Sequence, residues 1–276
     1  MGMIVIGEKL NGAIPSVAEM IAERKEDEIR KLARKQAEAG ADFIDVCAAV
    51  ESGEAETLRW MIELVQGVID VPVSIDSPNS DVLLEISSAL RKPGLFNSVS
   101  MESRKQIDRI FQMMSENPGW EVIAMLCDDE GIAGSFALGK RLRIFEEIMK
   151  KASSYKIEPF RIHIDPMVGA AALMGWEEPG DSGISEYIQV IREIRRLCPE
   201  VHITSAVSNI SHGLPARKYL NYSFVTLALE AGLDSGILDP LDRGLKGVIC
   251  GTETLLGKKG DEGCMEYIRA YKCGQF

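Results

Sequence analysis

The segments VPVSIDS (71–77) and FRIHIDP (160–166) decide the fold of this chain. Each is a short apolar run rich in Val or Ile that ends in an aspartate before Ser or Pro, which is typical of a buried parallel strand. Side chains alternate along a strand. Asp76 therefore shares a face with Ser74, opposite the aliphatic residues, and Asp165 has the same place in the second segment.

Runs of the same kind recur along the whole chain. Between them, apolar residues fall at helical spacing, as with Ile29, Ala33 and Ala37 before the stop at Gly40. Eight strands alternating with helices over about 250 residues predict an α/β fold, a (β/α)8 TIM barrel, and we expect residues 1–276 to form one domain. The other six strand candidates are IVIG (4–7), ADFIDVCA (41–48), GLFNSVS (94–100), EVIAMLC (121–127), VHITSAVSN (201–209) and SGILD (235–239).

The competing architecture is a doubly wound open sheet. That fold often carries a glycine-rich loop, G-x-G-x-x-G, after its first strand. The corresponding segment here, IGEKLNG (6–12), does not have this spacing, so the barrel is favoured.

Composition excludes several classes of protein. The 276 residues include 31 Lys and Arg against 42 Asp and Glu, a net charge of −11, which argues against nucleic-acid or anionic-membrane binding. No apolar run has the roughly 18 residues of a membrane span, and the N-terminus lacks the features of a signal peptide. The six cysteines form no C-x-x-C pair, so we expect mostly buried, reduced thiols in a cytoplasmic protein without a metal site.

Polar residues at the strand ends form the candidate site. Carboxyl ends of barrel strands meet at one mouth, so these side chains can converge. Any single aspartate could instead cap a helix, but several with matching inward parity favour a site. The set is acidic and almost without cations, which disfavours phosphate and suits adjacent N–H donors such as an aminopyrimidinone edge. Its members are Asp45, Asp76, Asn97, Asp128, Asp165 and Asn209, with Glu8 and Asn11 after the first strand.

Smaller predictions concern single residues and one loop. Ser80 is expected to cap a helix that runs from 81 to about 91. His163 reads as a core histidine, whereas His212 lies just beyond a strand and can line the mouth. The long irregular connection 165–183 is a candidate cover for the site or a docking surface for a partner.

The motifs resemble, in order, those of the pterin-binding methyltransferases that move a methyl group between tetrahydrofolate and a corrinoid protein. The same superfamily includes dihydropteroate synthase, whose phosphate loop after the first strand and Arg-x-His ending on the last strand are missing here. The motifs are IGEKLNG (6–12), GADFIDV (40–46), SIDSPN (74–79), LFNSVS (95–100), IDPMV (164–168), VSNISHG (207–213) and GLDSGILDP (232–240).

The resemblance implies roles for the site residues. Asp76, Asn97 and Asp165 match the residues that hold the pterin ring, and Asn209 matches the catalytic asparagine near folate N5. The chain departs from its relatives at Cys47 and Asp128, where asparagine is common. The remaining predicted substrate-binding residues are Glu8, Asn11, Asp45, Asp128, Ser211 and His212.

The resemblance also implies substrates and partners. Tetrahydrofolate or methyltetrahydrofolate is the expected substrate, and the corrinoid (cobalamin) is expected on a separate protein, because the chain lacks an Asp-x-His-x-x-Gly pattern. Members of the family are typically homodimers. Two other functions stay open at this point: a pterin condensation of the dihydropteroate synthase kind, and a non-catalytic pterin-binding subunit.

Overall fold

The computed structural model describes residues 2–128, 138–174, 183–258 and 260–276, and in these ranges eight parallel strands form one sheet. The order of the sheet is β7-β6-β5-β4-β3-β2-β1-β8, so strands β1 to β7 pair in chain order and β8 pairs with β1. The strands are β1 (Ile4–Asn11), β2 (Phe43–Cys47), β3 (Val73–Asp76), β4 (Leu95–Val99), β5 (Glu121–Met125), β6 (Ile162–Asp165), β7 (His202–Ile203) and β8 (Ser235–Leu238).

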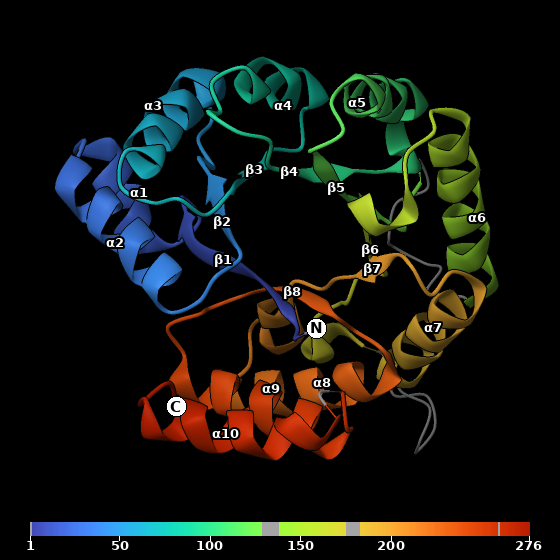
Figure 1. Cartoon of the computed structure of the whole chain (residues 1–276). Coiled ribbons are helices and arrows are strands. Elements are labelled where there is room, and N and C mark those ends of the chain that lie inside the picture. The colour runs from blue at the N-terminus through green and yellow to red at the C-terminus, as the bar shows by residue number, and fades with distance from the viewer. Residues whose placement is uncertain (1, 129–137, 175–182, 259) are drawn as a thin grey trace.

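Backbone hydrogen bonds between β8 and the β7 segment close this sheet into a barrel. The amide of Asp234 donates to the carbonyl oxygen of Ile203 at 3.2 Å, and the amide of Ile237 donates to that of Ser205 at 2.9 Å. Figure 1 shows the closed ring of strands inside a ring of helices. The predicted TIM barrel is therefore confirmed.

Helices follow the strands and cover the outside of the barrel. Short 3₁₀ segments lie between them, of which η3 (Ala171–Leu173) and η4 (Val207–Ser211) follow β6 and β7. The helices are α1 (Pro15–Ala22), α2 (Glu26–Glu38), α3 (Glu54–Gln66), α4 (Ser80–Ser87), α5 (Arg104–Glu116), α6 (Leu138–Ser154), α7 (Gly183–Leu197), α8 (Arg217–Ala231), α9 (Arg243–Leu255) and α10 (Gly263–Lys272).

The interior of the barrel separates an apolar layer from a polar one. Ile6, Phe43, Leu95 and Ile123 form a buried cluster inside the ring of strands. His163 lies in the same interior, fully buried, with its ring nitrogens bonded to Glu121 and Ser235, which confirms the core histidine. Because side chains alternate, the residues two positions beyond this layer point into the mouth of the barrel.

The structure corrects two local predictions. The cap of α4 is Asn79, whose side-chain oxygen accepts from the amide of Asp81 at 2.9 Å, and the helix ends at Ser87 rather than near 91. Ser80 is the first helical residue and cannot serve as the cap. The expectation of mostly buried thiols is also wrong: all six cysteines are free, but among them only Cys127 is buried.

The largest correction concerns the seventh strand. The run 201–209 predicted one long strand, but the regular strand ends at Ile203; single contacts with the neighbouring strands continue to Ala206, and the backbone then turns into η4. Asn209 therefore lies at the mouth because the 3₁₀ turn η4 places it there, and not because it alternates with its neighbours along a strand. The first strand is longer than predicted, since it pairs with β2 as far as Asn11. Among the described residues, no helix is long and apolar enough to cross a membrane.

Candidate functional site

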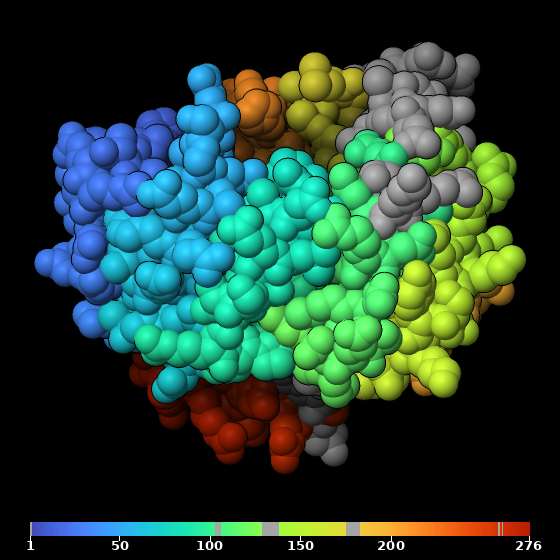
Figure 2. Space-filling model, turned by 90° about the horizontal axis from the view of Figure 1, so that it is seen from above, coloured from blue at the N-terminus to red at the C-terminus, as the bar shows by residue number. Residues whose placement is uncertain are grey.

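A cavity of about 760 Å³ opens at the carboxyl ends of the strands. In Figure 2 the segments after β2, β6 and β7 rise at the top, at the end of the barrel opposite α10. Most of the predicted site residues line this cavity. They are Glu8, Asn11, Asp45, Asp76, Asn97, Asp165, Asn209 and His212.

Asp45 is the innermost carboxyl group and organises its neighbours. Its side chain is 3% exposed, and one of its oxygens, Oδ1, accepts from Ser74 Oγ at 2.5 Å and from Asn97 Nδ2 at 3.1 Å. Burial and the charge of Asp76 raise the pKa of Asp45 well above its usual value, although the two hydrogen bonds lower it. Asn97 thus keeps one N–H and its side-chain oxygen for a ligand.

Asp76 and Asp165 end two strands and face the same space. Burial raises the pKa of Asp76 to about 6, opposed by a hydrogen bond with Cys47. Burial also raises the pKa of Asp165 to about 6, opposed by the amide of Met167, which donates to Oδ1 at 2.8 Å, and by the charge of Arg141. Both carboxyl groups can accept from N–H donors near neutral pH, and such donors would stabilise their charged forms.

An irregularity in β1 brings two consecutive side chains to the cavity. Successive residues of a regular strand face opposite sides, but the pairing of β1 with β2 shifts between Gly7 and Leu10. Glu8 and Lys9 therefore both line the cavity. Lys9 Nζ lies 3.1 Å from Asp239 Oδ2, so its charge is neutralised within the wall.

Arg217 at the start of α8 fixes the turn that carries Asn209. One guanidinium nitrogen donates to the carbonyl oxygen of Ser208 at 2.8 Å, and Nε donates to Ser211 Oγ at 3.0 Å. Ser211 is fully buried and does not line the cavity. Its hydroxyl oxygen holds Arg217, and its role in substrate binding stays a prediction.

Asp128 is the second predicted residue outside the cavity lining. Its Oδ1 lies 3.0 Å from Lys140 Nζ on α6, so an ion pair holds it beyond the end of β5. Asn11 lines the cavity, but its side-chain oxygen accepts from the amide of Ala13 at 2.8 Å and so shapes the loop after β1.

The sequence analysis missed the cations of the site. Lys9 and Arg217 both line the cavity, contrary to the expectation of almost none. Strand alternation concealed Lys9, because its neighbour Glu8 had already been assigned inward. Arg217 lies eight positions after Asn209, and only the folded turn brings it back. Both cations are engaged with protein groups, so the expectation against a phosphate site stands as a prediction.

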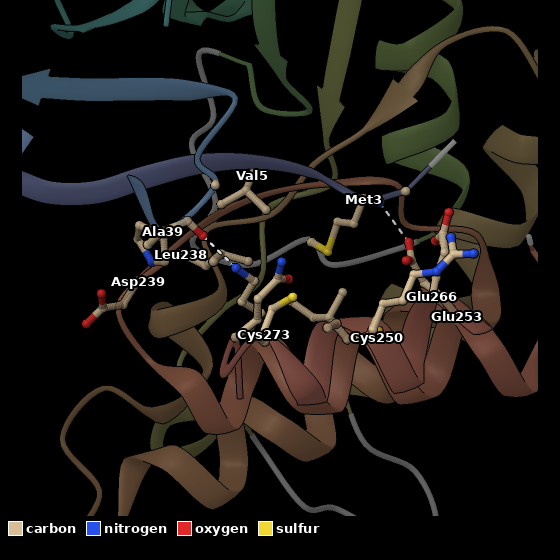
Figure 3. Close-up of a pocket in the computed structure, with 17 residues that line it drawn as sticks. Met3, Val5, Ala39, Leu238, Asp239, Cys250, Glu253, Glu266 and Cys273 are labelled. Carbon is tan, nitrogen blue, oxygen red and sulfur yellow. Dashed lines mark hydrogen bonds between the residues drawn. The ribbon is translucent and has the colours of Figure 1, made fainter. Parts of the chain in front are cut away.

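A second cavity, of about 390 Å³, lies outside the barrel wall between β1 and the helices α9 and α10 (Figure 3). Glu253 Oε1 accepts from the amide of Met3 at 2.7 Å, and Lys246 Nζ donates to the carbonyl oxygen of Ala39 at 2.7 Å. These bonds tie α9 to the residue before β1 and to the end of α2. The described residues include no cluster of His, Cys, Asp and Glu that could hold a metal ion.

Fold and site together define a pterin-binding enzyme. The model of the family described as pterin binding enzyme matches residues 8–239, and the chain belongs to this family. A methylcorrinoid:tetrahydrofolate methyltransferase of Eubacterium limosum is 42% identical over 275 residues, which are 99% of this chain and 97% of that protein. The family resemblance inferred from the motifs is confirmed.

Two other similar proteins match this chain less completely: in one, the match covers only part of the relative's length, and in the other only the fold is shared. A methionine synthase of Mycobacterium leprae is 30% identical over 247 residues, which are 86% of this chain and 20% of that protein. The crystal structure of Yersinia pestis dihydropteroate synthase superimposes with a TM-score of 0.64 at 16% identity and covers 93% of each chain. At this identity, the match shows a common fold.

Proposed function

We propose that this protein is a methyltransferase that moves a methyl group, in either direction, between N5 of tetrahydrofolate and the cobalt of a corrinoid carried by a separate protein. The observation that carries the proposal is the acidic, amide-lined cavity at the strand ends, with Asn209 at its wall. Among pterin chemistries, the near full-length likeness to the Eubacterium limosum enzyme favours methyl transfer.

The inner end of the cavity suits the pterin ring. Asp76 and Asp165 offer carboxylate oxygens to the ring N–H and the amino group. The hydrogen bonds that each carboxyl group makes within the protein leave it able to accept further N–H donors. Asn97, oriented by Asp45, offers one acceptor and one donor to the remaining ring edge. We assign these three residues to pterin binding.

Asn209 is the proposed catalytic residue, positioned at N5. Transfer from methylcorrinoid uses the N5 lone pair and then releases the N5 proton, whereas the opposite direction requires N5 to be protonated. An amide can donate or accept after rotation, so Asn209 can hold N5 in either state. Catalysis then rests on positioning and on control of charge at N5.

The corrinoid protein must approach the open end of the barrel. The connection 165–183 remains our candidate docking segment; residues 175–182 lie outside the described part, but Leu173 on η3 is 86% exposed at this end. Homodimerisation and a cytoplasmic location also remain proposals. Sedimentation of the purified protein tests the first, and fractionation of cells tests the second.

The test of the proposed function mixes the protein with methylcobalamin and tetrahydrofolate. Loss of the methyl–cobalt absorption together with formation of methyltetrahydrofolate supports it. Folate binding without methyl exchange, also in the presence of a methylated corrinoid protein, would indicate a non-catalytic subunit. Turnover of a pterin pyrophosphate with p-aminobenzoate would indicate the condensing chemistry instead.

A further inference from the structure

Glu8 lies in the cavity wall, and the proposed chemistry gives it no step. Its Oε2 accepts from Ser208 Oγ at 3.0 Å, a bond between residues 200 positions apart. Ser208 directly precedes Asn209. The bond therefore joins the rigid wall of β1 to the turn that carries the proposed catalytic amide.

The turn η4 depends on such outside contacts. At its two ends, the amide of Asn209 donates to the carbonyl oxygen of Ala206, and the amide of His212 donates to that of Asn209, both at 3.1 Å. A 3₁₀ turn of this length has poor hydrogen-bond geometry and little intrinsic stability. Ser208 is held on both sides, by Arg217 at its carbonyl oxygen and by Glu8 at its hydroxyl.

Strand alternation from the buried Ile6 points Glu8 into the mouth, and the register shift in β1 brings Lys9 there beside it. Without this shift, only one of two adjacent side chains would face the cavity. The groups that act on the Glu8 carboxyl are Ser208, Lys9, Arg217 and Asp239. Burial and the charge of Asp239 raise the pKa of Glu8, and this rise is opposed by the hydrogen bond from Ser208 and by the charges of Lys9 and Arg217. In either protonation state, an oxygen of the Glu8 side chain can accept from the Ser208 hydroxyl.

We propose that Glu8 is a positioning residue which, through the Ser208 hydroxyl, fixes the Asn209 amide against N5 of the folate. This inference rests on the proposed function, in which Asn209 contacts N5. It differs from a role in proton transfer. Glutamine at position 8 keeps an oxygen that can accept from Ser208 but cannot take up or release a proton, so Glu8→Gln separates the two roles.

The kinetic test compares Glu8→Ala, Glu8→Gln and Ser208→Ala, with the exposed surface variant Glu200→Ala as control. Methyl transfer from methylcobalamin to tetrahydrofolate is measured by loss of methyl–cobalt absorbance. Glu8→Ala and Ser208→Ala should lower kcat about tenfold, since small misplacements of a catalytic group are costly, and KM for folate should change less than about twofold. Glu8→Gln should restore most of the rate. Equal losses in Glu8→Gln and Glu8→Ala would overturn the proposal.

A double-mutant cycle asks whether Glu8 acts through Asn209. In an Asn209→Ala background, Glu8→Ala should lower kcat no further, because there is no amide left to position. Losses that multiply would mean that Glu8 acts independently and would refute the inference.

A measurement without substrate separates this inference from the proposed function. With asparagine-selective ¹⁵N labelling, the side-chain amide signal of Asn209 is assigned by its loss in Asn209→Ala. The signal should shift or broaden in Glu8→Ala and Ser208→Ala, and stay in place in Glu200→Ala. An unchanged signal overturns the positioning role. An inactive wild-type protein with a perturbed signal in these variants would overturn only the methyltransferase assignment.

Discussion

Replacing Asp165 with asparagine tests how the cavity recognises the pterin. Asparagine keeps an oxygen for the amide of Met167, which now donates to Asp165 Oδ1 at 2.8 Å. The other oxygen becomes an NH₂ group, which would point its donors at the donors of the ligand. Loss of one charge-assisted hydrogen bond in a buried site costs about 1.5–3 kcal/mol, so the Kd for methyltetrahydrofolate should rise roughly 10- to 150-fold.

The pH dependence makes this prediction sharper. Burial raises the pKa of Asp165 to about 6, so the fraction of charged carboxylate falls roughly tenfold between pH 7 and pH 5. The contribution of the Asp165 carboxylate to binding is present above pH 6 and is lost as the pH falls through 6. The ratio of the variant Kd to the wild-type Kd should therefore shrink towards one at low pH.

Isothermal titration of methyltetrahydrofolate from pH 5 to pH 8 measures both effects. The ratio of the two Kd values provides the control, because protonation of the ligand changes the Kd of both proteins by the same factor. Equal affinities at pH 8, or a ratio independent of pH, would refute the assignment of Asp165 to the pterin.

Three further predictions address catalysis and stability. Asn209→Ala should lower the methyl-transfer rate by a larger factor than it weakens folate affinity; a stopped-flow rate equal to wild type would contradict this. Phe96→Ala removes a buried ring stacked on Trp120 at 4.4 Å between centroids, and urea denaturation should show a loss of about 3–5 kcal/mol. Burial lowers the pKa of His163, so the unfolded chain binds its proton more readily. Stability should therefore fall as the pH drops below about 6.5, and less so in His163→Gln, as compared by denaturation at pH 5 and 7.

Most of the fold was predictable because the barrel depends on local patterns. Short aliphatic runs alternate with helical periodicity, and each aspartate at the end of a run marks the carboxyl edge of a strand. Parity along these runs correctly placed Asp76 and Asp165 inward, since alternation is a property of the extended backbone itself. The same logic failed for the end of 201–209, where the segment leaves the sheet after Ala206 and turns into η4.

The exceptions in the site arise from side-chain contacts and from a register shift, neither of which the residue pattern shows. Asp128 was expected inside but is held away by Lys140 of the following helix, and Ser211 is buried behind the cavity by Arg217. Lys9 was overlooked because a register shift breaks the alternation of β1. None of these contacts follows from strand alternation or helical periodicity.

The sequence by itself determined the barrel, the edge at which its polar residues gather, and the family to which the chain belongs. These features follow from periodicity and from motifs in a fixed order. The tertiary structure alone decided which residues meet: the bond from Glu8 to Ser208 spans 200 positions, and the two donors to Asp45 come from neighbouring strands. Periodicity fixes the direction of a side chain along one element, whereas its hydrogen-bond partners depend on how all the elements close around the cavity.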